Sequence, residues 1–219
     1  MLKRRWRTIG LATLALFAAA AWGVYALLPY AGETRSGLAT ATLNAPAPNF
    51  TLPGADGKPH SLTDYRGKTV VLEWTSAICE FTARKYQYGS IQAFEKATVA
   101  DGVAWLQISS APAGPSSHLT AAAAQALIAA RGLTITGLLL DDSGAAGKSY
   151  GARATPTVAI IDKAGVLRYY GAFDDAPWSD FATAGRRYAA SALQAVAAGK
   201  PPEPAKTAAY GCFIPYGDL

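Results

Sequence analysis

Short apolar runs alternate with helically spaced apolar positions along most of this 219-residue chain. Short apolar runs predict buried strands at 69–72, 103–108, 138–141, 157–162 and 166–170, and the first of them is rich in β-branched residues. Helical patterns occupy 61–68, 80–97, 118–131, 144–150 and 181–198. Within residues 80–97, apolar side chains are spaced to face one core: Phe81, Tyr88, Ile91 and Phe94.

The order of these elements predicts an α/β fold. Strands alternate with helices first, and the tight turn Lys163–Gly165 then joins the last two strands as an antiparallel pair. A closing helix follows this pair. We therefore expect a three-layer sandwich with a central mixed β-sheet, preceded by an N-terminal apolar helix.

The N-terminus has the pattern of an export signal. Lys3, Arg4, Arg5 and Arg7 precede an apolar run at 9–28. These four residues also account for most of the net charge of +5, because without them 16 basic residues face 15 acidic ones. Nothing in this balance favours a nucleic-acid surface.

Two outcomes are open for this segment. The small residues Ala19–Ala21 resemble a cleavage site, whereas the apolar run is about 20 residues long, which is enough to span a bilayer. We favour an uncleaved anchor that tethers a periplasmic or otherwise extracytoplasmic domain. The expected organisation is a signal or anchor segment at 1–28, a linker at 29–45, a domain at 46–199 and a tail at 200–219.

Cys79 is placed where the first buried strand gives way to a helix. At a helix N-terminus, free N–H groups and the helix dipole favour a thiolate, which is a nucleophile. The alternative is a buried structural cysteine that behaves as a small apolar residue. Two cysteines allow one pairing, Cys79 with Cys212, and export favours a disulfide.

Several motifs together resemble one known group. They are Trp74–Phe81, Thr155–Pro156, Ile161–Gly165, Ala47–Leu52, Asp56–Lys58 and Ser61–Leu62. In this order they are similar to the thioredoxin-like superfamily and, within it, to redoxins of the alkyl hydroperoxide reductase and thiol-specific antioxidant type. The resemblance covers about residues 45–199 and implies the thioredoxin-like form of the sandwich.

The resemblance also implies site residues. Cys79 is the position with which that group attacks a peroxide or a disulfide. Thr75 and Ser76 are hydroxyl donors for its sulfur or its substrate, and Trp74 borders the site. Pro156, after Thr155, is the expected cis-proline that faces the cysteine and offers backbone groups to a substrate.

Two family positions differ in this chain. Pro156 stands where peroxiredoxins carry a peroxide-binding arginine, and Leu72 stands where they carry a proline before the cysteine. No second cysteine follows Cys79 at the spacing of a thioredoxin dithiol, so the resolving thiol must be Cys212. Arg84 and Lys85, on the following helix, are candidates to lower the pKa of the thiol.

We therefore predict an extracytoplasmic thiol-based oxidoreductase in which Cys79 is the nucleophile and Cys212 the resolving thiol. It would exchange disulfides with protein thiols or reduce hydroperoxides, with an external thiol reductant, a membrane tether and no nucleic-acid partner. Neither an organic cofactor nor a metal is expected, because the two histidines, His60 and His118, lack ligand partners at a suitable spacing. The alternative is a non-enzymatic binding or scaffold domain with a structural Cys79–Cys212 disulfide.

Overall fold

The computed structural model describes residues 41–216. The predicted anchor at 1–28 lies outside this range, as do residues 29–40 of the predicted linker. Within 41–216, none of the helices combines the length and the apolar character needed to cross a membrane.

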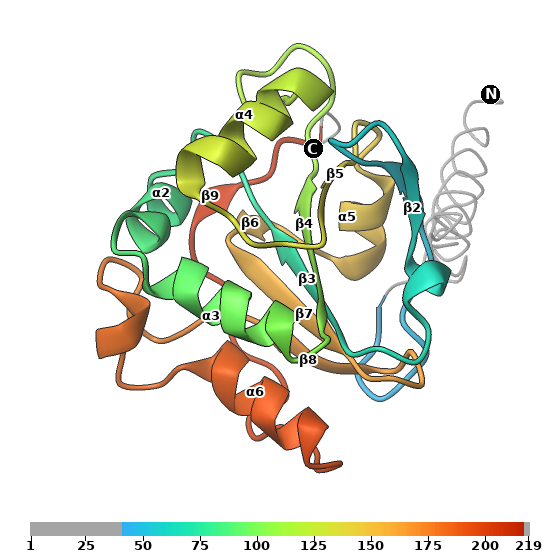
Figure 1. Ribbon diagram of the computed structural model, residues 1–219, viewed down its shortest axis with the longest axis vertical. Coiled ribbons are helices and arrows are strands. Elements are labelled where there is room, and N and C mark those ends of the chain that lie inside the picture. Colours follow the sequence, from blue (N-terminus) through green and yellow to red (C-terminus); the bar gives the residue numbers. More distant parts are fainter. Residues whose placement is uncertain (1–40, 217–219) are drawn as a thin grey trace, which may run out of the picture. The chain divides into compact units, whose positions relative to one another are not determined.

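A five-stranded mixed sheet with the strand order β5-β4-β3-β7-β8 forms the centre of the fold (Figure 1). Its strands are β3 (Val70–Trp74), β4 (Ala104–Ser109), β5 (Gly137–Leu140), β7 (Thr157–Ile161) and β8 (Leu167–Gly171). The first three are parallel, and β7 runs antiparallel to both β3 and β8. The predicted α/β architecture with a central mixed sheet is confirmed.

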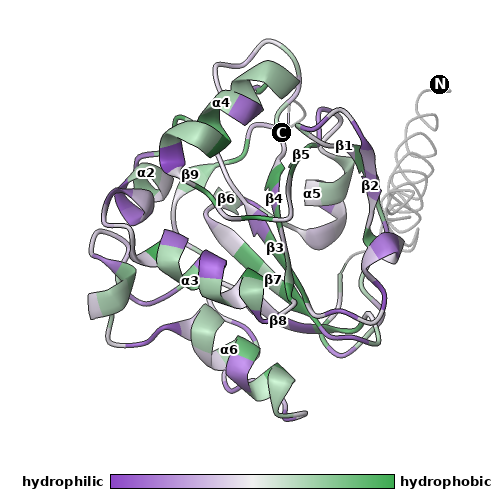
Figure 2. Cartoon of the chain, viewed as in Figure 1, coloured by the Kyte–Doolittle hydropathy of each residue, from purple (hydrophilic) through white to green (hydrophobic). Residues whose placement is uncertain are grey.

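Helices and a hairpin cover the two faces of this sheet. One face carries α2 (Glu80–Gln87), α3 (Ser90–Ala100), α4 (Ala121–Arg131) and α6 (Tyr188–Ala197). The other face carries α5 (Ala145–Tyr150), the hairpin of β1 (Thr51–Pro53) and β2 (Pro59–Ser61), and the 3-10 helix η1 (Leu62–Tyr65). Figure 2 shows the hydrophobic residues concentrated in the central strands between these layers.

Alternation along β3 divides its side chains between the two cores. Val70, Leu72 and Trp74 join the core on the α5 side, whereas Val71 joins the core under α2, α3 and α6. Glu73 faces the same side as Val71, so a carboxyl group enters an otherwise apolar layer.

The helix predicted at 80–97 is two helices. The chain breaks at Gly89, whose φ of 83° lies in the left-handed region that glycine tolerates best. Ile91 is fully buried as expected, but Tyr88 is 45% exposed, so its predicted place in the core is wrong. Because the chain changes direction at this break, apolar residues before and after Gly89 do not lie on one continuous helix face.

The closing helix predicted at 181–198 is shorter than expected. Residues Phe181–Thr183 form the 3-10 helix η2, and α6 begins only at Tyr188. Between them, Asp175 holds the chain in an extended form, because its backbone N–H donates to Arg186 O and its Oδ1 accepts from Arg186 N.

Candidate redox site

Cys79 and Cys212 form a disulfide, which confirms the one pairing that the sequence allows. Their Cα atoms lie 5.6 Å apart although 133 positions separate them in the chain. The bond therefore ties the C-terminal tail to the junction of β3 and α2.

Cys79 is the N-cap residue of α2, as the strand-to-helix pattern predicts. Its backbone is extended, and its carbonyl accepts the first helical hydrogen bond, from Ala83 N at 2.8 Å. The Cys79 side chain has no exposed surface, and the Thr155 carbonyl oxygen lies 3.1 Å from its sulfur. A helix N-terminus stabilises a thiolate on Cys79, whereas the carbonyl favours a protonated thiol that can donate to it.

The tail reaches this site as a strand. β9 (Cys212–Phe213) pairs antiparallel with β6 (Ala154–Thr155), and Cys212 lies opposite Thr155 (Figure 1). The Thr155–Pro156 peptide bond directly after β6 is cis, as expected. Cys212 is thus held against the segment that the family resemblance assigns to substrate binding.

Contacts other than the disulfide also hold the tail. Thr207 accepts a hydrogen bond from Ala172 N at 2.9 Å, and the Tyr210 hydroxyl donates to Asp174 Oδ1 at 2.7 Å. Beyond Cys212, the Ile214 N–H donates to Arg153 O at 3.0 Å, and the Ile214 side chain is buried in the core on the α5 side. The polar, Pro-rich tail therefore contributes to the core, which its composition did not indicate.

Three of the five predicted substrate-binding residues line one small cavity, and Pro156 and Trp74 do not. Thr75, Ser76, Thr155 and three tail residues line it, with Ser110, Ala111 and Ser117 completing the wall. The centre of a water molecule fits within a volume of about 10 Å³ in this cavity, so the cavity has room for about one water molecule. Trp74 is not part of this wall; it is fully buried, and its ring packs against Tyr150 of α5.

Three hydroxyl groups at this cavity lack a hydrogen-bond partner among residues 41–216. They belong to Thr75, Ser117 and Thr155, which are all at least nine-tenths buried. Unpaired buried hydroxyls are unfavourable, so a small polar molecule such as water is the natural occupant of the cavity.

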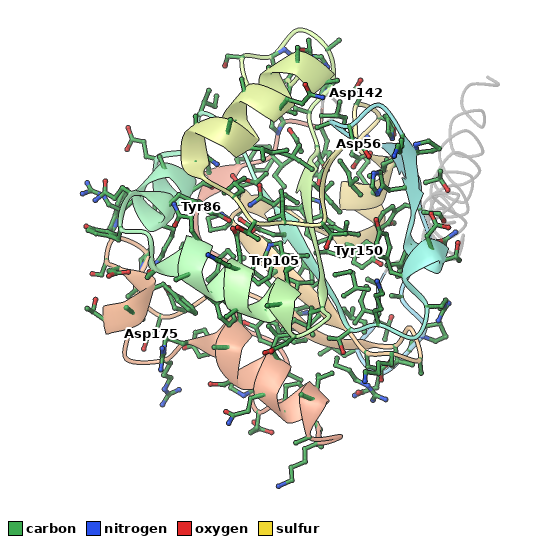
Figure 3. All side chains as sticks on the ribbon, in the orientation of Figure 1. Asp56, Tyr86, Trp105, Asp142, Tyr150 and Asp175 are labelled. Carbon is green, nitrogen blue, oxygen red and sulfur yellow. A yellow bond between two sulfur atoms is a disulfide. The ribbon has the colours of Figure 1, made fainter. Side chains whose placement is uncertain are left out.

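A buried acidic cluster next to the sheet was not predicted. The Glu73 and Glu95 carboxyl groups both contact the Tyr86 hydroxyl, at 2.9 Å and 2.5 Å. Gln107 Nε2 lies 2.7 Å from the same hydroxyl, and the Trp105 indole donates to Glu73 at 3.0 Å. Tyr86 and Trp105 are labelled in Figure 3. A glutamate within the apolar run 70–74 was the sequence signal for this cluster.

Proton counting indicates that at least one of the two carboxyl groups is protonated. The Tyr86 hydroxyl has one proton, so it can donate to only one of them. The other close approach needs a proton on a carboxyl oxygen. Burial raises the pKa of Glu73 to about 7, although three hydrogen bonds oppose the shift. Burial and the charge of Glu73 raise the pKa of Glu95 to about 8.

Arg131 connects this cluster with the loop that leads to Cys79. Its guanidinium lies over the Tyr86 ring at 5.3 Å, and its Nη2 lies 3.4 Å from Ser76 O and 3.5 Å from Ala77 O. Burial lowers the pKa of Arg131, and the charges of the acidic cluster oppose this shift. Arg131 is thus the basic residue that links the loop to the acids.

Lys85 is not placed to lower the pKa of the Cys79 thiol, which was its predicted role. Its ammonium is fully buried and pairs with Asp174 at 2.7 Å, with Ala176 O and Ser179 O also in contact. These acceptors occupy its protons, so Lys85 fixes the segment under the tail. No cluster of histidine, cysteine or acidic side chains in the described part of the chain is arranged to hold a metal ion.

The comparisons with known proteins agree with this fold. The Redoxin family profile matches residues 42–185. Of the solved structures, a hypothetical protein from Sinorhizobium meliloti 1021 is 26% identical, with a TM-score of 0.73 over 82% of this chain and 97% of that one. An uncharacterized conserved protein from Geobacillus kaustophilus is 22% identical, with a TM-score of 0.71 over 79% of this chain and 91% of that one.

A search of curated proteins found no match to the chain. The profile match covers more than half of the sequence and includes the strand, the loop and the helix that present Cys79. The chain therefore belongs to the Redoxin family and has the thioredoxin-like fold that its motifs predicted.

Proposed function

We propose that this protein is an extracytoplasmic thiol–disulfide oxidoreductase whose Cys79–Cys212 disulfide opens and closes during its reaction with protein thiols. The observation that carries the proposal is the position of the bond: it joins the N-cap of α2 to a strand that lies against Thr155. A thiolate at that N-cap is stabilised as a leaving group, which makes the bond exchangeable. The export pattern of the N-terminus and the disulfide itself support the location.

Disulfide exchange fits the geometry better than peroxide reduction. In the oxidised protein, Cys79 has no exposed surface, and Pro156 occupies the place of the family's peroxide-binding arginine. Exchange needs only that a partner's thiolate reach one of the two sulfurs. The tail contacts then keep the second thiol close enough to close the bond again.

A second function is favoured by one observation. Complete burial of Cys79 is also what a structural disulfide in a binding or scaffold domain would show. The two functions predict different reduction potentials. Structural disulfides of secreted proteins lie below about −300 mV, whereas exchangeable ones lie higher.

A redox titration distinguishes them. The full-length protein is equilibrated in dithiothreitol buffers, its thiols are alkylated, and the reduced fraction is measured by mass spectrometry. We expect a potential above about −300 mV and transfer of the disulfide to a reduced peptide dithiol. The Cys212→Ser variant is the matched control and should transfer nothing. A lower potential without transfer would assign the bond to the scaffold function.

A further inference from the structure

The two sulfurs of the disulfide are unequal in the folded protein. Cys79 is 0% exposed, whereas Cys212 is half-buried in a short strand near the end of the chain. The chain neighbours Ile78 and Phe213 are 59% and 61% exposed, so solvent reaches the surface around the bond without reaching Cys79. The tail itself covers the cysteine at the helix N-terminus.

Their chemical environments are also unequal. Cys79 caps an eight-residue helix, where free N–H groups stabilise a departing thiolate, and Cys212 has no such support in β9. In thiol–disulfide exchange, the sulfur with the lower thiol pKa is the better leaving group, and the accessible sulfur is the one attacked. Accessibility favours attack at Cys212, and the helix N-terminus assists the departure of Cys79, whereas burial and the Thr155 carbonyl oppose a thiolate there. The difference in accessibility therefore sets the direction.

We infer that an incoming thiolate attacks Cys212, and that Cys79 is the leaving group. The sequence predicted the reverse, with Cys79 as the sulfur that forms the bond with the partner and Cys212 as the resolving thiol. The inference rests on the proposed function and specifies its first step.

The step balances as an exchange. The partner's thiolate forms a bond with Cys212 Sγ, the Cys79–Cys212 bond breaks, and Cys79 leaves with the electron pair. The proton released by the partner's thiol to solvent is matched by one that Cys79 takes up. The resulting thiol can donate to Thr155 O, which already lies 3.1 Å from the sulfur. A second partner thiol then displaces Cys212, so the partner is oxidised and the protein is reduced.

The contacts of the tail should keep the direction of attack the same in every reaction cycle. Tyr210 on one side of Cys212 and Ile214 on the other are fixed to Asp174 and to the core, so β9 stays over Cys79 when the bond opens. A partner therefore meets Cys212 in the first exchange as well as in later ones.

Glutathione tests the direction on the oxidised full-length protein. The protein is mixed with reduced glutathione, quenched at short times with N-ethylmaleimide in guanidinium chloride so that buried thiols are also labelled, digested and analysed by mass spectrometry. We expect glutathione on Cys212 and maleimide on Cys79, with about a tenfold excess over the opposite arrangement. Glutathione mainly on Cys79 would overturn the inference and leave the proposed function standing. A bond that resists both glutathione and dithiothreitol in the folded protein would contradict both.

Two single variants provide a second measurement. Folded Cys79→Ser, which keeps the Cys212 thiol, should react with iodoacetamide about tenfold faster than folded Cys212→Ser, which keeps Cys79. The same pair in guanidinium chloride should react at similar rates, because unfolding removes the difference in burial. Equal rates in both folded variants would contradict the inference.

Discussion

At the scale of single residues, Gly211 decides how closely the tail approaches β6. Its φ is 130°, and a Cβ at this position would overlap the Thr155 carbonyl oxygen. That carbonyl is the group that contacts the Cys79 sulfur. The absence of a side chain before Cys212 is therefore what allows the two cysteines to meet.

Replacing this glycine should loosen the bond. In Gly211→Ala, we expect β9 to be displaced, the disulfide to be reduced at lower dithiothreitol concentrations, and Cys79 to be alkylated about tenfold faster once reduced. The matched control is Gly199→Ala, which also has a positive φ of 68° but meets no atom within 4 Å. The measurement is a redox titration with timed alkylation of both variants. Equal behaviour of the two variants would show that close approach at Gly211 is unimportant.

The raised pKa values of Glu73 and Glu95 predict a pH dependence of stability. Their pKa values of about 7 and about 8 lie above the ordinary value of 4.5, so the folded state holds protons that the unfolded state loses. The free energy of unfolding should therefore fall as the pH rises from about 5 through 8, by a few kcal/mol in all. Urea unfolding at several pH values measures this slope.

A conservative variant separates this effect from general titration. Glu95→Gln keeps the shape of the side chain and removes one of the two carboxyl groups with raised pKa values. We expect a clearly shallower slope between pH 5 and pH 8 than in the unmodified protein. An unchanged slope would mean that other groups cause the dependence.

At the scale of elements, the tail is fastened to the segment after β8 through a buried ion pair. Lys85 of α2 holds Asp174, and Asp174 Oδ1 also accepts the Tyr210 hydroxyl, whose ring lies 5.7 Å from the Lys85 ammonium. A helix, a loop and the tail therefore meet at one carboxylate. We expect this arrangement to hold β9 next to β6 when the disulfide is reduced.

Tyr210→Phe tests this fastening. The substitution removes a hydrogen bond to a buried carboxylate, and we expect the free energy of unfolding to fall by about 1.5–3 kcal/mol. Amide exchange should also quicken in residues 210–214. Tyr88→Phe is the control, because that side chain is 45% exposed, and its stability should be unchanged. A Tyr210→Phe protein as stable as the control would show that the tail is held elsewhere.

The elements themselves were largely predictable from the sequence. β3, β4, β5, β7 and β8 begin and end within two residues of the predicted strands, because short apolar runs bounded by turn residues are typical of buried strands. The helices predicted at 80–97 and 181–198 were wrong in length, because the chain interrupts each helical pattern. Gly89 ends one helix, and the contacts between Asp175 and Arg186 keep η2 apart from α6.

At the scale of the whole molecule, the site depends on contacts that sequence patterns do not encode. The order of motifs predicted Cys79 at a helix start and Thr155–Pro156 nearby, and the cysteine count predicted the pairing. The pairing of β9 with β6 was not predictable, because two residues in a Pro-rich tail carry no periodicity. This pairing places Cys212 beside Cys79, so the inferred direction of exchange depends on it together with the position of Cys79 at the start of α2.

The long loop that the disulfide closes gives the last prediction. A bond across 133 positions should stabilise the fold by about 3–5 kcal/mol, chiefly by restricting the unfolded chain. The double variant Cys79→Ala with Cys212→Ala should lose this amount in urea unfolding. Because folding and bond formation are linked, the fold must stabilise the bond equally. The potential of the native disulfide should thus lie roughly 60–110 mV below that in denaturant. Two values that agree but fall below these ranges would mean that the native geometry strains the bond. Two values that disagree would mean that the alanine variant does not represent the reduced protein.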